Sequence, residues 1–280
     1  MKDPGRIIVA TMMKVGSRSL VRTIKKQSAH DVTMIHNLTG NQLDPFPLRP
    51  DEKNTEKWPT FQRVQKTEYV LSGSVEQGVW CGPPAYLVSG VRDPVARAVS
   101  LIGFISNGCG YTEYGVTARD GGTPEALMML LQTCLKTLRS GEPSTDSVIS
   151  WFCRAIADYD QWFDRVTGRG FGIDVYDHAF DPSRCALTAG SNSRLLVFRV
   201  EDMGKRQLRD SLGDFLRTDI PSIENDDKSG ERRFVELYKG FKAIAKFDDE
   251  TLDWFYDNRT VRHFYSAAEI QSFREKWSLS

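Results

Sequence analysis

The sequence has no excess of either charge, few cysteines and histidines, and no long apolar run. Its 280 residues include 37 Lys and Arg against 37 Asp and Glu, so the formal net charge is zero. A chain without a positive field has no general attraction to nucleic acid or anionic membranes, so we expect no nucleic-acid partner and only local anion sites. With 40% hydrophobic and 11% aromatic residues, the composition is that of an ordinary globular protein and excludes a disordered or fibrous chain.

The cysteines indicate a reducing compartment. There are five, an odd number, widely spaced and without a C-x-x-C pair or a nearby histidine that would complete a zinc site. The apolar stretch at residues 7–13 is far shorter than the roughly 20 residues that span a bilayer, and it lacks a small-residue cleavage site. We therefore expect a cytoplasmic protein with no signal peptide and no membrane span.

Apolar spacing predicts an α/β fold. The β-branched run at residues 6–11 is typical of a buried parallel strand, and the apolar residues at 17–26 have helical spacing. Further strands are expected at residues 32–35, 68–71, 85–91, 172–176 and 195–200, and helices at 94–104, 124–138, 146–166 and 266–277. This alternation is typical of a mainly parallel sheet flanked by helices. Because no Pro- or Ser-rich linker divides the chain, we expect a single domain over residues 1–280, with loop excursions at about residues 37–65 and 103–122.

The loop between the first strand and the first helix combines features of an anion site. Lys14 and Arg18 carry positive charge, and Gly16 permits close backbone approach. Ser17 and Ser19 offer hydroxyl donors at a helix N-terminus, which itself attracts anions. A tight turn with two solvated cations explains the same residues equally well. The loop is not a Walker A motif, because there the lysine directly follows a glycine, whereas here it precedes Gly16.

A second candidate anion site follows the strand at residues 85–91. Arg92 stands at the strand end, and Asp93 is an expected N-cap with proline in the first helical turn. Arg97 and Ser100 are three residues apart on the helix and can face one side. A guanidinium with a nearby hydroxyl suits a phosphate monoester, because it donates two parallel charge-assisted hydrogen bonds. The alternative is a structural Arg92–Asp93 ion pair with Ser100 as an ordinary surface residue.

Together the two segments resemble the 5′-phosphosulfate and 3′-phosphate motifs of sulfotransferases that use 3′-phosphoadenosine 5′-phosphosulfate (PAPS). The first motif, P-K-x-G-[ST]-x-[ST]-L, is matched from Lys14 to Leu20, with Met13 in place of the proline. The second, R-D-P-x-x-R-x-x-S, is matched throughout residues 92–100, and residues 195–203 look like the family's late strand ending in R-x-E-D-L. The resemblance implies a P-loop-like nucleotide-binding fold. It also implies a sulfotransferase that takes PAPS as co-substrate and releases adenosine 3′,5′-bisphosphate (PAP).

Three further segments are similar to a branch of this superfamily formed by capsular polysaccharide synthesis proteins. They lie at residues 162–164, 171–176 and 263–270. Folding alone also explains them, as an amphipathic helix, a strand, and a C-terminal helix with Ser266 and Glu269 in capping-box positions. The similarity implies a carbohydrate acceptor, whereas the residues themselves leave sugars, phenols, peptide tyrosines and lipid headgroups open.

The resemblance also implies roles for individual residues. Lys14 would contact the leaving oxygen, and Arg92 and Ser100 would hold the 3′-phosphate. The residues that bind the 5′ groups would be Lys14, Val15, Gly16, Ser17, Arg18, Ser19 and Leu20. This leaving group requires no metal, in keeping with a sequence that has no carboxylate or histidine cluster with ligand spacing.

The general base is less clearly indicated than the nucleotide site. In the branch that sulfates glycan uronic acids, catalytic histidines lie in a segment similar to residues 69–76, where this chain has serines. The candidates are Glu76, in that segment, and His36, at the end of the second expected strand. A lone histidine is more often structural. The missing histidines leave open a relative that binds the nucleotide without turnover, and a P-loop kinase is a third alternative, disfavoured by the lack of a Walker A motif.

Acceptor recognition is expected in the two excursions, because long loops on a rigid sheet commonly carry it. Trp58, Phe61, Tyr111 and Tyr114 are suited to stack on a sugar or a phenolic ring, and they are equally suited to be packing anchors. The expected partner is a hydroxyl-bearing acceptor, either a carbohydrate or a small molecule.

Overall fold

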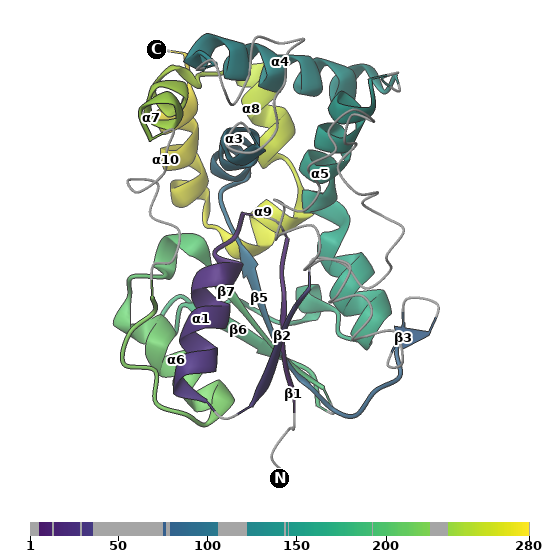
Figure 1. The fold of residues 1–280 in the computed structure, drawn as a ribbon, viewed down its shortest axis with the longest axis vertical. Helices are drawn as coiled ribbons and strands as arrows, with labels where there is room; N and C mark the ends of the chain where they lie inside the picture. Colours follow the sequence, from purple (N-terminus) through teal and green to yellow (C-terminus); the bar gives the residue numbers. More distant parts are fainter. Residues whose placement is uncertain are drawn as a thin grey trace, which may run out of the picture. The chain divides into compact units, whose positions relative to one another are not determined.

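The computed structural model describes residues 6–12, 14–28, 30–35, 75–76, 79–105, 122–142, 144, 146–191, 193–224 and 235–279 (Figure 1). The chain divides into two compact units. The sheet unit comprises Met1–Val91 and Gln161–Asp226, and the helical unit comprises Arg92–Asp160 and Asp227–Ser280. The expected strand at 68–71, the excursion at 37–65 and most of that at 103–122 lie outside the described residues.

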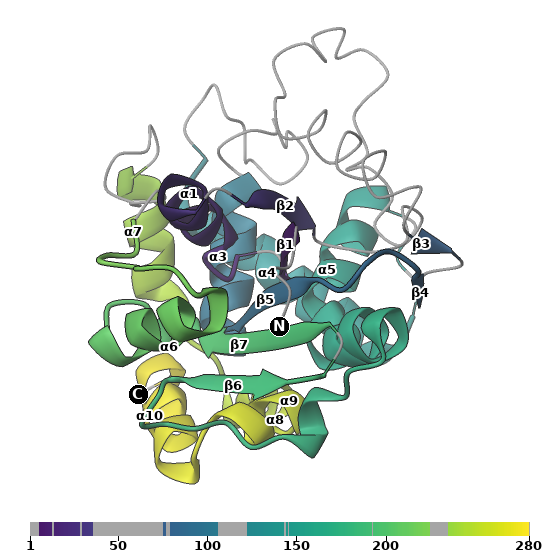
Figure 2. The same ribbon diagram turned by 90° about the horizontal axis from the view of Figure 1, so that it is seen from below.

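A five-stranded sheet forms the centre of the sheet unit. Its strands are β1 (Arg6–Ala10), β2 (Asp31–Ile35), β5 (Tyr86–Val91), β6 (Ala186–Ala189) and β7 (Arg194–Arg199), in the order β2-β1-β5-β7-β6 (Figure 2). All neighbouring strands are parallel except β6 and β7, which are antiparallel. The prediction of an α/β fold with a mainly parallel sheet flanked by helices is confirmed.

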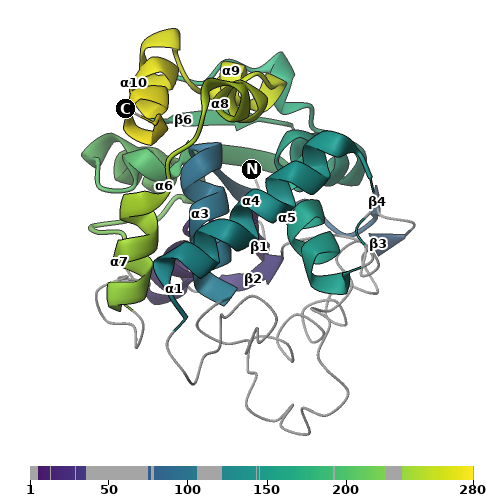
Figure 3. The same cartoon turned by 90° about the horizontal axis from the view of Figure 1, so that it is seen from above.

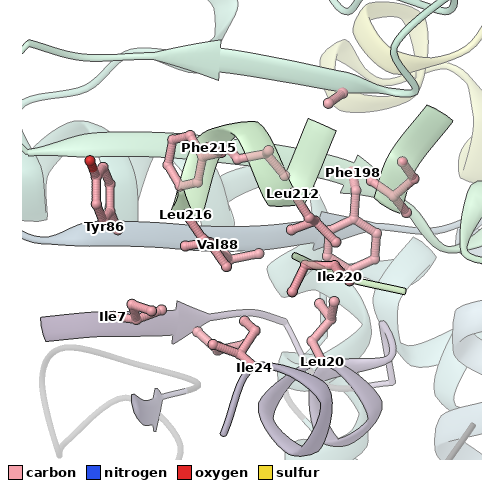
Figure 4. Close-up of a cluster of buried hydrophobic side chains, with 14 of the residues drawn as sticks. Ile7, Leu20, Ile24, Tyr86, Val88, Phe198, Leu212, Phe215, Leu216 and Ile220 are labelled. Atoms are coloured by element: carbon pink, nitrogen blue, oxygen red, sulfur yellow. The ribbon is translucent and has the colours of Figure 1, made fainter. Parts of the chain in front are cut away.

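Both faces of the inner strands are buried, which explains their continuous apolar sequences. Leu87 and Val88 are consecutive in β5, so they point to opposite faces, and both are fully buried. On one face the helices α1 (Ser17–Gln27) and α6 (Arg206–Leu216) pack against the strands. Each fully buried aliphatic or aromatic side chain there contributes about 1.5–3 kcal/mol. The cluster includes Leu20, Ile24, Val88, Phe198, Leu212 and Phe215 (Figure 4).

Several elements of the sheet unit differ from the sequence-based expectation. Residues 172–176 are not a strand. The Asp174 carboxylate accepts a hydrogen bond from Tyr176 N at 2.9 Å and closes the 3₁₀ turn η3 (Val175–Asp177) instead. The edge strand β6 was not expected, because its four residues offer too short an apolar pattern. The remaining elements are β3 (Val75–Glu76), β4 (Val79–Trp80), the π-helical turn η2 (Asp164–Arg169) and the 3₁₀ turn η4 (Val200–Asp202).

The described part of the helical unit is built from helices. They are α3 (Pro94–Ile105), α4 (Pro124–Ser140), α5 (Ser147–Phe163, whose last three residues belong to the sheet unit), α7 (Val235–Ile244), α8 (Asp249–Tyr256), α9 (Arg259–Phe264) and α10 (Ala267–Trp277). The helix α4 contacts both α3 and α7 (Figure 3). The capping box of Ser266 and Glu269 forms at the start of α10 as expected. Over the described ranges, none of the helices has the length and apolar character needed to cross a membrane.

Candidate anion-binding site

The loop that joins β1 to α1 holds two residues in left-handed backbone conformations. Lys14 has a φ of 69° and Gly16 has a φ of 77°. Glycine adopts this conformation without a steric cost, whereas for a lysine it costs roughly 1–2 kcal/mol. Strained residues of this kind are concentrated at functional sites, so the backbone of Lys14 is itself an indication of function.

The helix α1 begins directly after this loop. Leu20 N donates to Gly16 O at 3.2 Å, a hydrogen bond that starts the helix. Because glycine occupies the N-cap position, that residue supplies no side-chain oxygen to the N–H groups of the first turn. The positive end of the helix dipole therefore lies at the loop, an arrangement that favours bound anions.

The charged and hydroxyl side chains of the loop differ in exposure. Arg18 is exposed and Lys14 is half-buried. Ser17 and Ser19, predicted as hydroxyl donors, are only 7% and 4% exposed. The solvent-facing chemistry of the loop is therefore mainly cationic, and the two hydroxyls lie on the buried side of the first helical turn.

Two glycines let the loop lie close to neighbouring parts of the sheet unit. A Cβ atom on Gly90 of β5 would lie 3.1 Å from Val15 O and 2.6 Å from the Phe198 ring. A Cβ atom on Gly16 would lie 2.6 Å from the Met203 sulfur. Val15 itself is fully buried, so its side chain anchors the loop in the core.

Met203 follows a turn that a buried charge network holds in place. The Arg199 guanidinium donates to both oxygens of the Asp202 carboxylate, at 2.6 and 3.1 Å, and Lys205 Nζ lies 2.7 Å from Asp202 Oδ1. The hydrogen bond to Asp202 raises the pKa of Lys205 above its ordinary value. Arg199 also lies over the Phe180 ring, 4.6 Å from its centroid. This network explains the R-x-E-D pattern at residues 199–202, which begins at the last residue of β7.

The second motif begins where β5 ends. The strands β1 and β5 are parallel neighbours, so their carboxyl ends lie at the same edge of the sheet. Arg92 is the residue after the last residue of β5. Asp93 caps α3 as predicted, because its carboxylate accepts a hydrogen bond from Val95 N at 3.0 Å. Both motif segments therefore leave the sheet at the edge where open α/β sheets bind ligands.

Arg97 and Ser100 of the second motif are buried. Arg97 is 2% exposed, donates from Nη2 to Ala155 O at 2.7 Å and lies over the Tyr159 ring. Burial lowers the pKa of Arg97 to about 10, and the charge of Arg92 adds to the lowering, so Arg97 stays protonated at neutral pH. Ser100 is 7% exposed. Arg97 is therefore committed to internal contacts, whereas Arg92 is half-buried.

Three aromatic side chains from distant parts of the sequence hold the Arg92–Asp93 segment. Tyr159 OH donates to Arg92 O at 2.8 Å, Tyr256 OH to Asp93 Oδ1 at 2.9 Å, and Trp277 Nε1 to Asp93 Oδ2 at 2.7 Å. The partners are 67, 163 and 184 residues apart in the sequence. No local pattern marks contacts of this range, so these residues were not among the expected site residues.

Of the two candidate bases, Glu76 lies within the described residues and His36 does not. Glu76 lies on β3, where its backbone pairs with Val79 of β4. His36 lies outside the described residues, as do Trp58, Phe61, Tyr111 and Tyr114. The assignment of the base therefore stays a prediction.

Comparisons of the chain with protein-family models, with curated proteins and with solved structures found no match. The class of this protein is therefore inferred from the two motif segments and from the geometry around them.

Gly16→Ala is expected to weaken anion binding at the loop. A φ of 77° costs an alanine about 1–2 kcal/mol, and the added methyl group displaces the flexible end of Met203. Gly141→Ala is the matched control, because Gly141 has a φ of 69° and no atom within 4 Å of its Cβ position. Thermal unfolding should show a loss of stability in both variants, whereas titration with PAP should show a loss of affinity only in Gly16→Ala. Equal PAP affinity in the two variants would contradict this role of the loop.

Proposed function

We propose that the chain is a sulfotransferase that moves a sulfuryl group from PAPS to an acceptor hydroxyl. The observation that carries the proposal is the β1–α1 loop, where Lys14 is held in a strained conformation just before a helix N-terminus capped by glycine. The R-D-P-x-x-R-x-x-S segment supports it, since Arg92 follows the neighbouring strand at the same sheet edge. A P-loop-like nucleotide-binding fold and a cytoplasmic location are parts of the same proposal.

The residues of the two segments suit a nucleotide with phosphate groups at both ends of its ribose. The N–H groups of the α1 N-terminus and the Arg18 guanidinium bind the 5′-phosphosulfate. The Arg92 guanidinium binds the 3′-phosphate through charge-assisted hydrogen bonds, with the Ser100 hydroxyl as a further donor. The loop and Arg92 thereby divide the recognition of the nucleotide between them.

The chemical role of Lys14 follows from where charge develops. The acceptor oxygen forms a bond to sulfur while the bond from sulfur to the bridging phosphate oxygen breaks, which releases PAP and leaves charge on that oxygen. The Lys14 ammonium stabilises this charge, because it is compact, carries three donors and stands on a flexible stem. The proton of the acceptor hydroxyl passes to a base, for which Glu76 and His36 are the candidates.

Calorimetric titration with PAP, without added metal, tests the proposal directly. Adenosine 5′-phosphate and ATP serve as controls. Micromolar binding that requires the 3′-phosphate supports the proposal, and an acceptor screen with labelled PAPS then tests for transfer. Equal binding of adenosine 5′-phosphate contradicts the proposal, and a preference for ATP with Mg²⁺ indicates a kinase. PAP binding without transfer to any acceptor favours the non-catalytic relative.

Arg92→Ala is expected to lower PAP affinity by about tenfold to thirtyfold, the effect of losing hydrogen bonds to a charged group. The affinity for adenosine 5′-phosphate should stay unchanged, and kcat should change less than KM, because the 3′-phosphate keeps its charge during the reaction. Arg154→Ala is the control, since it removes the same charge from an exposed position on α5. A loss of affinity that is equal for both nucleotides would show that Arg92 does not recognise the 3′-phosphate.

Among hydroxyl-bearing acceptors we favour a carbohydrate. The support for it is the resemblance of residues 162–164, 171–176 and 263–270 to capsular polysaccharide synthesis proteins. An acceptor screen that includes acidic and neutral glycans beside simple phenols tests this preference, and transfer to phenols alone would overturn it.

A further inference from the structure

Asp93 carries a buried carboxylate with donors from three separate parts of the helical unit. The residue is 1% exposed. Its Oδ1 accepts hydrogen bonds from Val95 N at 3.0 Å and from Tyr256 OH at 2.9 Å, and its Oδ2 accepts one from Trp277 Nε1 at 2.7 Å. A buried carboxylate needs such donors, because an unsatisfied charged acceptor is costly in a protein interior.

The two aromatic donors are themselves firmly placed. Tyr256 and Trp277 are 3% and 2% exposed. They belong to α8 and α10, which are joined by an ion pair in which Arg274 Nη1 lies 2.7 Å from Asp253 Oδ1. Burial, together with the charge of Asp93, raises the pKa of Tyr256 above its ordinary value, so its hydroxyl stays a donor at neutral pH.

The backbone of Arg92 is held from a second direction. Tyr159 OH donates to Arg92 O at 2.8 Å, and Tyr159 O accepts a hydrogen bond from Thr260 Oγ1 at 3.5 Å. The peptide that joins Arg92 to Asp93 is thus fixed on both sides, by Tyr159 at the carbonyl and by the aromatic donors at the carboxylate. Such a fixed peptide sets the direction in which the Arg92 side chain leaves the chain.

We propose that Trp277 and Tyr256 are positioning residues for Arg92, and that the C-terminal helix thereby takes part in recognition of the nucleotide 3′-phosphate. This inference rests on the proposed function. Two parallel hydrogen bonds from a guanidinium to a phosphate require a defined orientation, and small displacements of a binding group weaken recognition strongly. Neither aromatic residue contacts the nucleotide in this proposal. Each acts through the Asp93 carboxylate and the peptide before it.

Trp277→Phe tests the proposal, because it removes the Nε1 donor and keeps an aromatic ring in place. We measure the affinities for PAP and for adenosine 5′-phosphate by calorimetry and take their ratio, which isolates the contribution of the 3′-phosphate. The ratio should fall by about threefold to tenfold in the variant, since the loss of one hydrogen bond to a charged group displaces Arg92 without removing it. The affinity for adenosine 5′-phosphate should stay unchanged.

Trp254→Phe is the matched control. Trp254 is a half-buried tryptophan of α8 that packs edge-on against Phe255, and it is not one of the donors to Asp93. Both tryptophan variants should lose some stability in thermal unfolding, whereas only Trp277→Phe should change the nucleotide ratio. A lower unfolding temperature with an unchanged ratio would show that Trp277 is a packing residue alone, and would overturn the inference.

Tyr256→Phe gives an independent measurement, because it removes a single oxygen atom and preserves the packing of the ring. It should lower the ratio of PAP affinity to adenosine 5′-phosphate affinity, as Trp277→Phe does. This measurement tests the inference even if Trp277→Phe folds poorly. An unchanged ratio in a folded Tyr256→Phe protein overturns the inference while leaving the proposed function intact. A wild-type protein that binds PAP no better than adenosine 5′-phosphate overturns the proposed function and the inference with it, so the two failures are distinguishable.

Discussion

Lys14→Ala is expected to lower the rate of sulfuryl transfer by at least about 100-fold, the scale of losing one donor to a charge that develops in the transition state. The KM for PAPS should change much less than kcat, because in PAPS the bridging oxygen does not yet carry the charge that the ammonium stabilises. Steady-state kinetics with labelled PAPS measure both quantities. Lys25→Ala, an exposed lysine in the last turn of α1, controls for the loss of one positive charge.

The strained backbone of Lys14 gives this prediction a second readout. Glycine accepts a φ of 69° without the cost that a lysine bears there, so Lys14→Gly should be at least as stable as the wild-type protein in thermal unfolding. Its activity should nevertheless be as low as that of Lys14→Ala. A gain in stability with a loss of rate is the signature of strain retained for function. A near-normal rate in either variant removes Lys14 from the mechanism.

The parts of the fold that sequence patterns predicted are those determined by near neighbours in the chain. The strand β1 and the helix α1 follow from a buried β-branched run and from apolar residues at helical spacing. The start of α3 follows from Asp93, whose preference for the N-cap position is local chemistry. Each of these predictions depends on residues that lie within about ten positions of one another in the chain.

The parts that sequence patterns did not predict are determined by distant contacts or by competing local chemistry. At residues 172–176 an apolar run suggested a strand, but the Asp174 side chain competes for the backbone and forms a turn. The donors to Asp93 come from residues 163 and 184 positions further along the chain, where no pattern connects them to Arg92. The sign of φ at Lys14 is likewise set by the fold, since lysine alone has no preference for it.

The two arginines of the second motif, Arg92 and Arg97, show the same difference between what a sequence pattern predicts and what the fold determines. Both belong to the R-D-P-x-x-R-x-x-S segment, and the resemblance assigns the 3′-phosphate to Arg92 with Ser100. The structure commits Arg97 to Ala155 O and the Tyr159 ring, whereas Arg92, the residue after β5, is half-buried. A motif match therefore identifies the segment, and burial explains the internal contacts of Arg97.

Asp202→Ala is expected to lower the free energy of unfolding by about 3–5 kcal/mol, the cost of removing one partner from a buried ion pair. Arg199, at 5% exposure, then stays buried without the carboxylate to which it donates two hydrogen bonds. Chemical denaturation measures the loss. Asp210→Ala is the control, because Asp210 pairs with Arg206 at the surface, where such pairs contribute less than about 1 kcal/mol.

A double variant separates the cost of an unpaired charge from the function of the network. Arg199→Met with Asp202→Leu replaces the buried pair by apolar side chains, and such replacements restore stability to within about 1–2 kcal/mol of the wild type. If the network also places Met203 against Gly16, PAP affinity should fall in Asp202→Ala and should remain reduced in the double variant although stability recovers. Recovery of both quantities would show that the Arg199–Asp202 pair serves stability alone and that the β1–α1 loop keeps its conformation without it.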